Sequence, residues 1–351
     1  MKIINSPELY MQRCLTLAKC GSGHVSPNPL VGCVIVHKEK IIGEGYHKEF
    51  GGPHAEVNAI NSVKDKSHLS DSTLYVNLEP CAHFGKTPPC SDLIVSSKIP
   101  HVVIGTTDPF SKVSGKGIEK MEEAGVKVDV GLMEEESREI NKRFFTFHNR
   151  KRPYIILKWA ETVDGFIDRD RSKVISKPTW ITSDACKIAV HKQRADEDAV
   201  MVGTNTAERD NPSLSVRYWT GHNPLRLVLD RQHRLPSELH LFDYVHPTLV
   251  FTKDAKKNVK NLEYFEVDFE DYLHEDILDE LYERNIMSVI IEGGTRLLKG
   301  FISKGLWDEA WRFIGNKSFT SGIDAPRLTG ELVGREKMSD SILLVFKNKK
   351  Q

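Results

Sequence analysis

The chain has 351 residues, 39% of them hydrophobic and 28% charged, which is enough for two globular domains that each bury a core. The chain has 49 basic residues (lysine and arginine) and 49 acidic residues (aspartate and glutamate). This balance predicts no nucleic-acid partner, because binding a polyanion would need a basic surface. We expect no signal peptide and no membrane segment, because no run is long and apolar enough. The six cysteines lack the spacing of a disulfide framework, so we expect a cytoplasmic protein.

The first 150 residues are predicted to alternate between helices and strands, beginning with a helix from Ser6-Pro7 to about Gly21. Two apolar runs, residues 31–36 and 41–46, form a hairpin. Further strands are expected at 73–78, 102–105 and 126–130, and further helices starting at His54 and at 91–97, 117–124 and 134–147. This order favours an α/β domain with a mostly parallel sheet and a hairpin at one edge.

His54, Cys81 and Cys90 are of the residue types that bind zinc, one imidazole and two thiolates. Three protein ligands leave the fourth tetrahedral position to water, which is the catalytic arrangement. Glu56 lies two residues after His54, where it can handle the protons of that water. His-x-Glu followed by Pro-Cys and a second Cys is the zinc deaminase signature, in which an activated water attacks an amine-bearing ring carbon. The alternatives are a structural zinc site and two ordinary buried cysteines.

A domain boundary is predicted at Lys151-Arg152-Pro153, where a basic pair and a proline precede a new strand at 154–158. The alternation of strands and helices then starts again, which divides the chain into domains 1–150 and 151–351. Further strands are expected at 199–203, 225–230, 248–251 and 288–291, with helices after Thr182-Ser183-Asp184 and at 271–283.

The last of these strands leads into Glu292-Gly293-Gly294-Thr295 and a helix. Small residues let a phosphate approach the backbone, and a helix N-terminus supplies amide donors. Because a Gly-Gly corner is more often simple turn chemistry, the motif alone is weak evidence for phosphate binding.

Four motifs of the first half resemble the deaminase half of the bifunctional deaminase–reductases of riboflavin biosynthesis: Asn28-Pro29-x-Val31-Gly32, Gly43-x-Gly45-x-His47, His54-Ala55-Glu56 and Pro80-Cys81-x-His83-x-Gly85-Lys86-Thr87-Pro88-Pro89-Cys90. The long loop between the two cysteines is specific to this pyrimidine deaminase among the zinc deaminases. The resemblance implies a cytidine-deaminase-like α/β/α fold with Glu56 as the catalytic residue. It also implies a substrate pocket lined by Asn28, His47, His83, Lys86 and Thr87.

Motifs of the second half resemble the reductase half of the same family, whose α/β fold is similar to dihydrofolate reductase: Leu157-Lys158-x-Ala160-x-Thr162-x-Asp164-Gly165, Trp180-Ile181-Thr182-Ser183, Val202-Gly203-x-x-Thr206-x-x-x-Asp210-Asn211-Pro212-x-Leu214 and Ile291-Glu292-Gly293-Gly294. The resemblance implies NADPH contacts from Ala160, Trp180, Thr206, Asp210, Gly294 and Thr295. It implies substrate contacts from Lys158, Arg194, Leu214, Arg217 and Glu292, with arginine suited to the phosphate. The proton donor of the reduction stays open between Asp210, Glu292 and Lys158.

Together the two resemblances cover nearly the whole chain and imply a bifunctional enzyme that uses Zn²⁺ and NADPH. One activity would remove the pyrimidine 2-amino group of 2,5-diamino-6-ribosylamino-4(3H)-pyrimidinone 5′-phosphate. The other would reduce the ribosyl group to give 5-amino-6-ribitylamino-uracil 5′-phosphate. The expected partners are this small nucleotide-like substrate and further copies of the chain in a homo-oligomer. Two rivals are a nucleic-acid-editing deaminase, which would need a basic groove and stacking aromatics, and a non-enzymatic zinc module, which would use four protein ligands.

Overall fold

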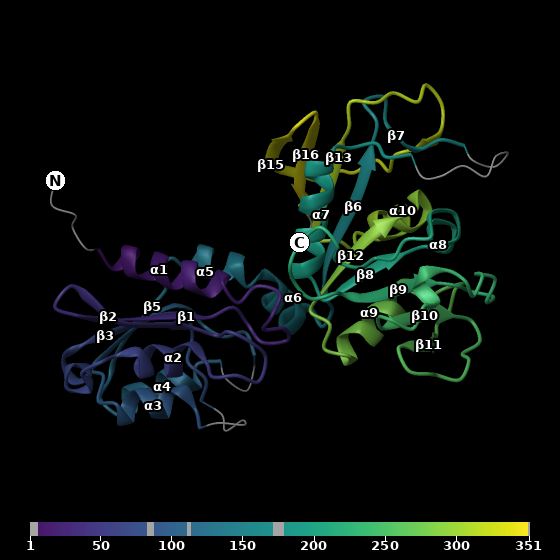
Figure 1. Ribbon diagram of the computed structural model, residues 1–351. Coiled ribbons are helices and arrows are strands. Elements are labelled where there is room, and N and C mark those ends of the chain that lie inside the picture. The colour runs from purple at the N-terminus through teal and green to yellow at the C-terminus, as the bar shows by residue number, and fades with distance from the viewer. Residues whose placement is uncertain (1–5, 83–87, 111–113, 171–178, 350–351) are drawn as a thin grey trace. The chain divides into compact units, whose positions relative to one another are not determined.

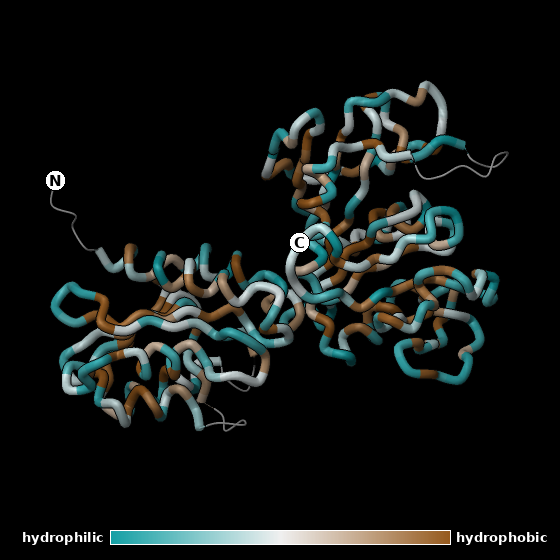
Figure 2. The backbone as a smooth tube through the Cα atoms, viewed as in Figure 1, coloured by the Kyte–Doolittle hydropathy of each residue, from teal (hydrophilic) through white to brown (hydrophobic). Residues whose placement is uncertain are grey.

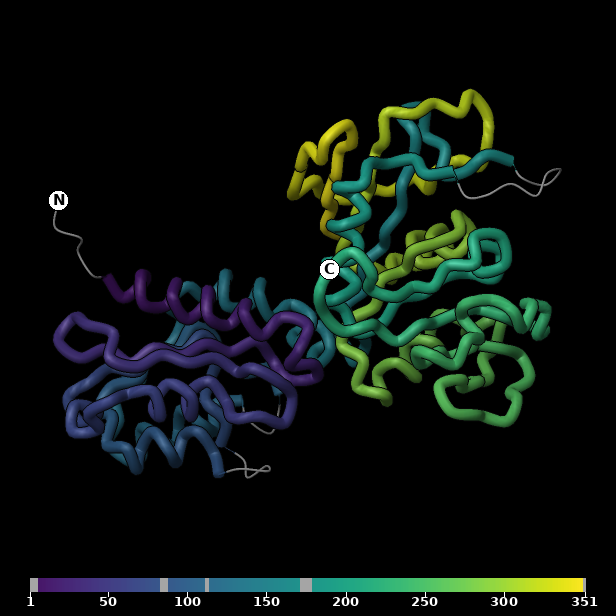
Figure 3. Tube along the Cα trace, viewed as in Figure 1, coloured from purple at the N-terminus to yellow at the C-terminus, as the bar shows by residue number. Residues whose placement is uncertain are grey.

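The computed structural model describes residues 6–82, 88–110, 114–170 and 179–349. The chain divides into two compact units, Met1–Lys151 and Arg152–Gln351, each with its own sheet and its own core. Figure 3 follows the chain through the first unit in purple and blue before it continues through the second in teal, green and yellow. None of the described helices is long and apolar enough to cross a membrane.

The first unit is built on a five-stranded sheet. Its strands are β1 (Gly32–His37), β2 (Lys40–Tyr46), β3 (Thr73–Leu78), β4 (His101–Thr106) and β5 (Lys127–Val130). They follow the order β2-β1-β3-β4-β5, in which β1 pairs antiparallel with both β2 and β3, while β3, β4 and β5 run parallel. The predicted hairpin is therefore present at one edge of a mixed sheet.

Helices cover both faces of this sheet, α1 and α5 on one side and α2, α3 and α4 on the other (Figure 1). The helices are α1 (Pro7–Lys19), α2 (Ala55–Ser62), α3 (Cys90–Ser96), α4 (Lys116–Glu123), α5 (Glu134–Ile140) and α6 (Lys142–Arg150), with a 3-10 turn η1 (Lys66–Asp71). Successive residues of a strand point to opposite faces, so a central strand of the sheet contributes to two cores. In β1, Cys33 and Ile35 pack with α2, whereas Val34 and Val36 pack with α1.

The single helix predicted over residues 134–147 is wrong, because the chain breaks there into α5 and α6 at Asn141. Asn141 is 3% exposed, and its side chain accepts a hydrogen bond from the Leu30 amide at 2.8 Å and donates to the Leu30 carbonyl at 2.9 Å. These contacts join residues 111 positions apart, so no local helical pattern could reveal them.

The second unit is built on a nine-stranded sheet in which most neighbouring strands run parallel. Its strands are β6 (Tyr154–Glu161), β8 (Ala199–Val202), β9 (Leu225–Leu229), β10 (Thr248–Thr252), β11 (Leu262–Glu266), β12 (Ser288–Gly293), β13 (Glu309–Ile314), β15 (Glu331–Met338) and β16 (Ser341–Lys347). The order is β11-β10-β9-β8-β12-β6-β13-β16-β15, and antiparallel pairing begins only at β16. A separate ribbon pairs β7 (Phe166–Asp168) with β14 (Ile323–Asp324).

The helices of the second unit bury the two faces of the larger sheet. They are α7 (Asp184–Asp196), α8 (Thr204–Asp210), α9 (Leu273–Glu283) and α10 (Thr295–Ser303), with a 3-10 turn η2 (His240–Phe242). Met201 of β8 packs in the core that contains α9 and α10, while its neighbours Val200 and Val202 pack in the core that contains α8. Figure 2 shows the hydrophobic residues concentrated along the strands of both units. The parallel strands end at one edge of the sheet, where α/β proteins bind ligands.

Candidate active sites

Three elements of the first unit deliver His54, Cys81 and Cys90 to one place. His54 is the N-cap of α2, Cys81 lies three residues after β3, and Cys90 is the first residue of α3. Helix α2 can sit close to β2 because β2 contains two glycines. A Cβ at Gly45 would come within 2.5 Å of the backbone nitrogen of Ala59, so only glycine allows this approach.

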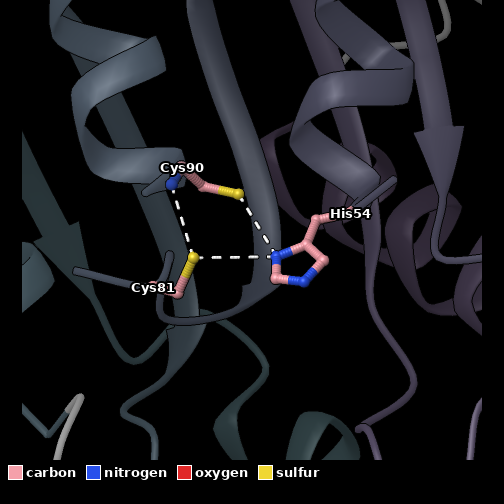
Figure 4. Close-up of side chains that lie close together, drawn as sticks. All are labelled: His54, Cys81 and Cys90. Atoms are coloured by element: carbon pink, nitrogen blue, oxygen red, sulfur yellow. Dashed lines mark hydrogen bonds between the residues drawn. The ribbon is translucent and has the colours of Figure 1, made fainter. Parts of the chain in front are cut away.

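The geometry of the three side chains fits a tetrahedral zinc ion. His54 Nδ1 lies 3.6 Å from Cys81 Sγ and 3.4 Å from Cys90 Sγ, and the three ligand atoms lie within 4.8 Å of one another. Zinc bonds of about 2.3 Å to sulfur and 2.0–2.1 Å to nitrogen give a tetrahedral N···S edge of about 3.6 Å. Figure 4 shows the imidazole and both sulfurs converging on a common point. No fourth metal-binding side chain joins them among the residues that the structure describes.

Glu56 lies in the first turn of α2 and is 3% exposed. Burial raises the pKa of its carboxyl group to about 7, and the nearby Cys81 thiolate acts in the same direction. A carboxyl group with a pKa near neutrality can both accept and return a proton, which is the requirement for a general acid–base.

Two of the residues implied in substrate binding lie beside this cluster. Asn28 Nδ2 and His47 Nε2 are 3.0 Å apart, and the His47 and His54 rings meet edge to face with centroids 5.3 Å apart. Burial lowers the pKa of His47, which favours a neutral ring. The other three, His83, Lys86 and Thr87, lie outside the described residues.

Two further acids near Cys81 were not identified from the sequence. Glu79 directly follows β3, the strand that leads to Cys81, and Asp108 lies shortly after the neighbouring strand β4. Asp108 is 7% exposed, and burial raises the pKa of its carboxyl group to about 7. The only sequence signal was their position just after parallel strands, which many loop residues share.

The second unit contains a cavity of about 1270 Å³ at the ends of its parallel strands. All of the residues implied in NADPH and reductase-substrate binding line it: Lys158, Ala160, Trp180, Arg194, Thr206, Asp210, Leu214, Arg217, Glu292, Gly294 and Thr295. They come from elements spread over more than a hundred residues, so the fold brings together what the motifs left separate.

A buried charge cluster occupies one part of this cavity. Arg194 donates to both oxygens of Glu292, at 2.6 and 2.7 Å, and Lys158 Nζ lies 3.9 Å from the same carboxylate. Burial alone would raise the pKa of Glu292, but Arg194 and Lys158 outweigh it and lower the pKa to about 2. Burial lowers the pKa of Lys158. Glu292 is therefore a fixed negative charge that orients two cations.

His191, one turn before Arg194 on α7, is a cavity residue that sequence reasoning missed. It is 5% exposed, and its Nδ1 accepts a hydrogen bond from the backbone nitrogen of Arg217 at 2.9 Å. Burial, together with Arg194 and Arg217, lowers the pKa of the ring to about 4, so the imidazole is neutral. Arg194 also donates to the Ser215 carbonyl at 3.2 Å, so α7 holds the segment that carries Leu214 and Arg217.

The Gly293–Gly294 corner joins β12 to α10 inside the same cavity. Gly294 has φ +76°, a backbone conformation that favours glycine, and a Cβ there would lie 3.2 Å from Thr206 Oγ1. The open backbone and the start of a nine-residue helix form a cradle of the kind that accepts a pyrophosphate. The residues present therefore fit a dinucleotide.

Two family models match the chain, one in each unit. Residues 4–106 match the cytidine and deoxycytidylate deaminase zinc-binding region, and residues 153–340 match the RibD C-terminal domain.

Relatives are similar over nearly the whole chain. The riboflavin biosynthesis protein RibD of Aquifex aeolicus is 41% identical over 319 residues, which cover 90% of this chain and 88% of that protein. RibD of Synechocystis is 39% identical and covers 97% of this chain and 92% of that protein. A crystal structure of a diaminohydroxyphosphoribosylaminopyrimidine deaminase/5-amino-6-(5-phosphoribosylamino)uracil reductase from Thermotoga maritima superposes with a TM-score of 0.88 at 38% identity, over 97% of this chain and 98% of that one.

Proposed function

The chain belongs to the RibD family of riboflavin-biosynthesis enzymes, and we propose that residues 1–150 carry its zinc-dependent deaminase and residues 151–351 its NADPH-dependent reductase. The two folds, a cytidine-deaminase-like α/β/α domain followed by a dihydrofolate-reductase-like α/β domain, support this proposal. The substrate is 2,5-diamino-6-ribosylamino-4(3H)-pyrimidinone 5′-phosphate. The observation that carries the proposal is the convergence of His54 Nδ1, Cys81 Sγ and Cys90 Sγ beside the buried Glu56.

In the deaminase, His54, Cys81 and Cys90 hold the zinc ion, which when bound supplies an activated water for attack on the amine-bearing carbon. Glu56 accepts a proton from that water and returns it to the departing nitrogen, so that ammonia leaves and oxygen takes its place. Asn28 and His47, in contact with each other and next to His54, bind the substrate. His83, Lys86 and Thr87 complete the pocket by family resemblance.

In the reductase, NADPH when bound supplies a hydride to the ribosyl carbon. Ala160, Trp180, Thr206, Asp210, Gly294 and Thr295 bind the cofactor, and Lys158, Arg194, Leu214, Arg217 and Glu292 bind the substrate. Glu292 is a poor proton donor because Arg194 and Lys158 lower its pKa to about 2. The proton therefore comes from Lys158 or Asp210, and Lys158 is favoured because it lies beside the substrate-binding cluster as a buried ammonium group.

The test is to incubate the full chain with the diaminopyrimidine phosphate, with and without NADPH, and to weigh the products by mass spectrometry. We expect exchange of an amino group for oxygen without NADPH, and a further gain of two hydrogens with it. A chelator should abolish the first change and leave reduction of the deaminated compound intact. Ammonia release after complete zinc removal would contradict the deaminase assignment.

The same chemistry supports a reducing, cytoplasmic location. Cys81 and Cys90 can bind a metal ion only in their thiolate form, and all six cysteines are free thiols in the structure. In an oxidising compartment, disulfide formation would compete with zinc for Cys81 and Cys90. Zinc content measured after purification under reducing and oxidising conditions tests this dependence.

We further propose a homo-oligomer. Strand β15 lies at the edge of the nine-stranded sheet and exposes Leu332 (52%) and Val333 (46%). Apolar residues on an open sheet edge favour association with another chain. Light scattering gives the mass in solution. A monomer at micromolar concentration would contradict the proposal.

A further inference from the structure

Two buried asparagines of the first unit direct their side-chain amides at one short backbone segment, residues 28–32. Asn77 lies on β3 and is 0% exposed, and Asn141 lies at the break between α5 and α6 and is 3% exposed. Neither stands at a defined position of the motifs that carry the family resemblance. Buried amides need hydrogen-bond partners, and the partners of these two show what they hold.

Both side chains bind the backbone of Leu30. Asn141 Oδ1 accepts a hydrogen bond from the Leu30 amide at 2.8 Å, and Asn141 Nδ2 donates to the Leu30 carbonyl at 2.9 Å. Asn77 Nδ2 donates to the same carbonyl at 3.0 Å, and Asn77 Oδ1 accepts from the Gly32 amide at 2.7 Å. The Leu30 carbonyl thus uses both of its lone pairs, and the segment is clamped between β3 and the α5–α6 break.

The close packing of α5 on the sheet brings Asn141 to this place. Ser137 of α5 is 0% exposed and lies against Gly105 of β4, where a Cβ would collide with the Ser137 hydroxyl. The same Cβ would lie 2.7 Å from the Asn77 carbonyl oxygen, so the glycine makes room for both neighbours. Helix α5 ends about one turn after Ser137, at Asn141. The clamp is therefore built into the packing of the unit.

The clamped segment carries Asn28 to its place beside the proposed zinc site. The Val31 carbonyl accepts from the His47 amide at 2.9 Å, and Asn28 Nδ2 lies 3.0 Å from His47 Nε2. His47 Nδ1 lies 3.1 Å from the Pro53 carbonyl, which can only accept, so Nδ1 carries the proton and Nε2 accepts from Asn28. Asn28 Oδ1 takes no part in that hydrogen bond and can accept one from a substrate.

We propose that Asn141 is a positioning residue of the deaminase: with Asn77 it holds the Leu30 backbone, and through it the orientation in which Asn28 binds the pyrimidine. Asn28 is only two residues from Leu30, so a shift of the clamped backbone reaches it directly. A displacement of about 1 Å can cost an enzyme about 10²-fold in rate. The inference rests on the proposed function, since it concerns the substrate affinity of that deaminase.

Deamination kinetics of the full chain test this, measured as ammonia release from the diaminopyrimidine phosphate without NADPH. Asn141→Ala should raise KM at least about fivefold, because one hydrogen bond contributes about 2- to 10-fold in affinity. We expect a change in kcat below about threefold and an unchanged zinc content. Tyr10→Phe is the matched control, because it removes a hydrogen bond to the Glu39 carbonyl, 3.0 Å long, beyond the other end of β1. Its KM should equal that of the wild type.

A double-mutant cycle separates positioning from a general weakening of the fold. If Asn141 acts through Asn28, Asn28→Ala already removes the group that Asn141 positions. The double variant Asn28→Ala/Asn141→Ala should then have a KM within about twofold of that of Asn28→Ala alone. A further rise of about fivefold in the double variant would overturn the inference, and so would a wild-type KM in Asn141→Ala.

A second variant keeps the test decisive if Asn141→Ala loses zinc or is misfolded by circular dichroism. Asn77→Ser removes the other amide donor to the Leu30 carbonyl and should raise KM in the same way. Loss of zinc or of the fold in this variant too would show that the two amides support the fold alone, and would overturn the inference. Absence of ammonia release by the wild type would instead contradict the deaminase assignment itself.

Discussion

Glu56 and Glu292 are both buried glutamates, yet their surroundings give them opposite protonation behaviour. Burial and a neighbouring thiolate raise the pKa of Glu56 to about 7. Around Glu292, Arg194 and Lys158 outweigh the effect of burial and lower the pKa to about 2. The first carboxyl group can therefore exchange a proton near neutral pH, and the second keeps its charge and orients cations.

Replacing Glu56 with glutamine should abolish deamination without removing the metal. The amide keeps the shape of the side chain but cannot accept a proton, and general acid–base catalysis typically contributes about 10²–10⁴-fold. We expect unchanged zinc content, deamination reduced by about that factor, and normal reduction of supplied deaminated compound. Glu49→Gln, at an exposed acid of the preceding loop, is the control. Near wild-type deamination by Glu56→Gln would remove Glu56 from the mechanism.

His191 is expected to act as a positioning residue through Arg217. His191→Ala loses the 2.9 Å hydrogen bond to the Arg217 amide, whereas His191→Asn can place its oxygen near the position of Nδ1. One such bond contributes about 0.5–1.5 kcal/mol, so the alanine variant should raise the reductase KM about 2- to 10-fold with a smaller change in kcat. The asparagine variant should have a KM close to that of the wild type. Equal effects of the two variants on KM would show that His191 acts through packing alone. Lys192→Ala, at an exposed position of the same helix, is the control.

At the scale of elements, the proposed metal ligands lie where helices and strands begin or end. His54 caps α2, Cys90 opens α3, and Cys81 follows β3. The sequence indicated this arrangement, since the three residues belong to a motif of recognisable residue types and order although they lie up to 36 positions apart, and the β1–β2 hairpin depends on residues close together in the chain. The positive end of a helix dipole also favours the thiolate form of a nearby cysteine.

Other elements depend on contacts that no local pattern records. The break at Asn141 exists because its side chain pairs with Leu30, 111 residues away. Strand β15 is exposed along most of its length, so it lacks the alternation that identifies a strand. His191 was missed for the same reason, because its role comes from Arg217 in a distant segment. Local sequence predicts motifs and hairpins, and tertiary contacts determine the rest.

Glu79 should stabilise the segment that leads into α4. Its carboxylate is 4% exposed and accepts hydrogen bonds from the amides of Asp108 at 3.2 Å, Gly115 at 3.1 Å and Gly117 at 3.1 Å. Glu79→Gln turns one acceptor into a donor and leaves a buried amide unpaired, at a cost of about 1–3 kcal/mol. We expect a lower Tm for the first unit, whereas Glu122→Gln, on the exposed side of α4, should not change it. An unchanged Tm would show that water replaces the lost acceptor.

At the scale of the whole molecule, the two chemistries share no residue. The proposed zinc ligands and Glu56 lie in the first unit, and every residue that lines the proposed reductase cavity lies in the second. Each unit also packs its own helices on its own sheet. Two self-contained units predict two activities that can be separated physically.

The fragments 1–150 and 151–351 should therefore fold and work independently. The second fragment must keep Arg152, whose guanidinium donates to both oxygens of the buried Asp308 at 2.6 and 2.9 Å. A fragment that begins at Pro153 would remove the guanidinium that pairs with the buried Asp308 carboxylate and should be less stable by about 3–5 kcal/mol in urea unfolding. Fragment 151–351 should bind NADPH and reduce the deaminated compound without zinc. If it folds by circular dichroism but does not bind NADPH, the cofactor does not belong to the second unit alone.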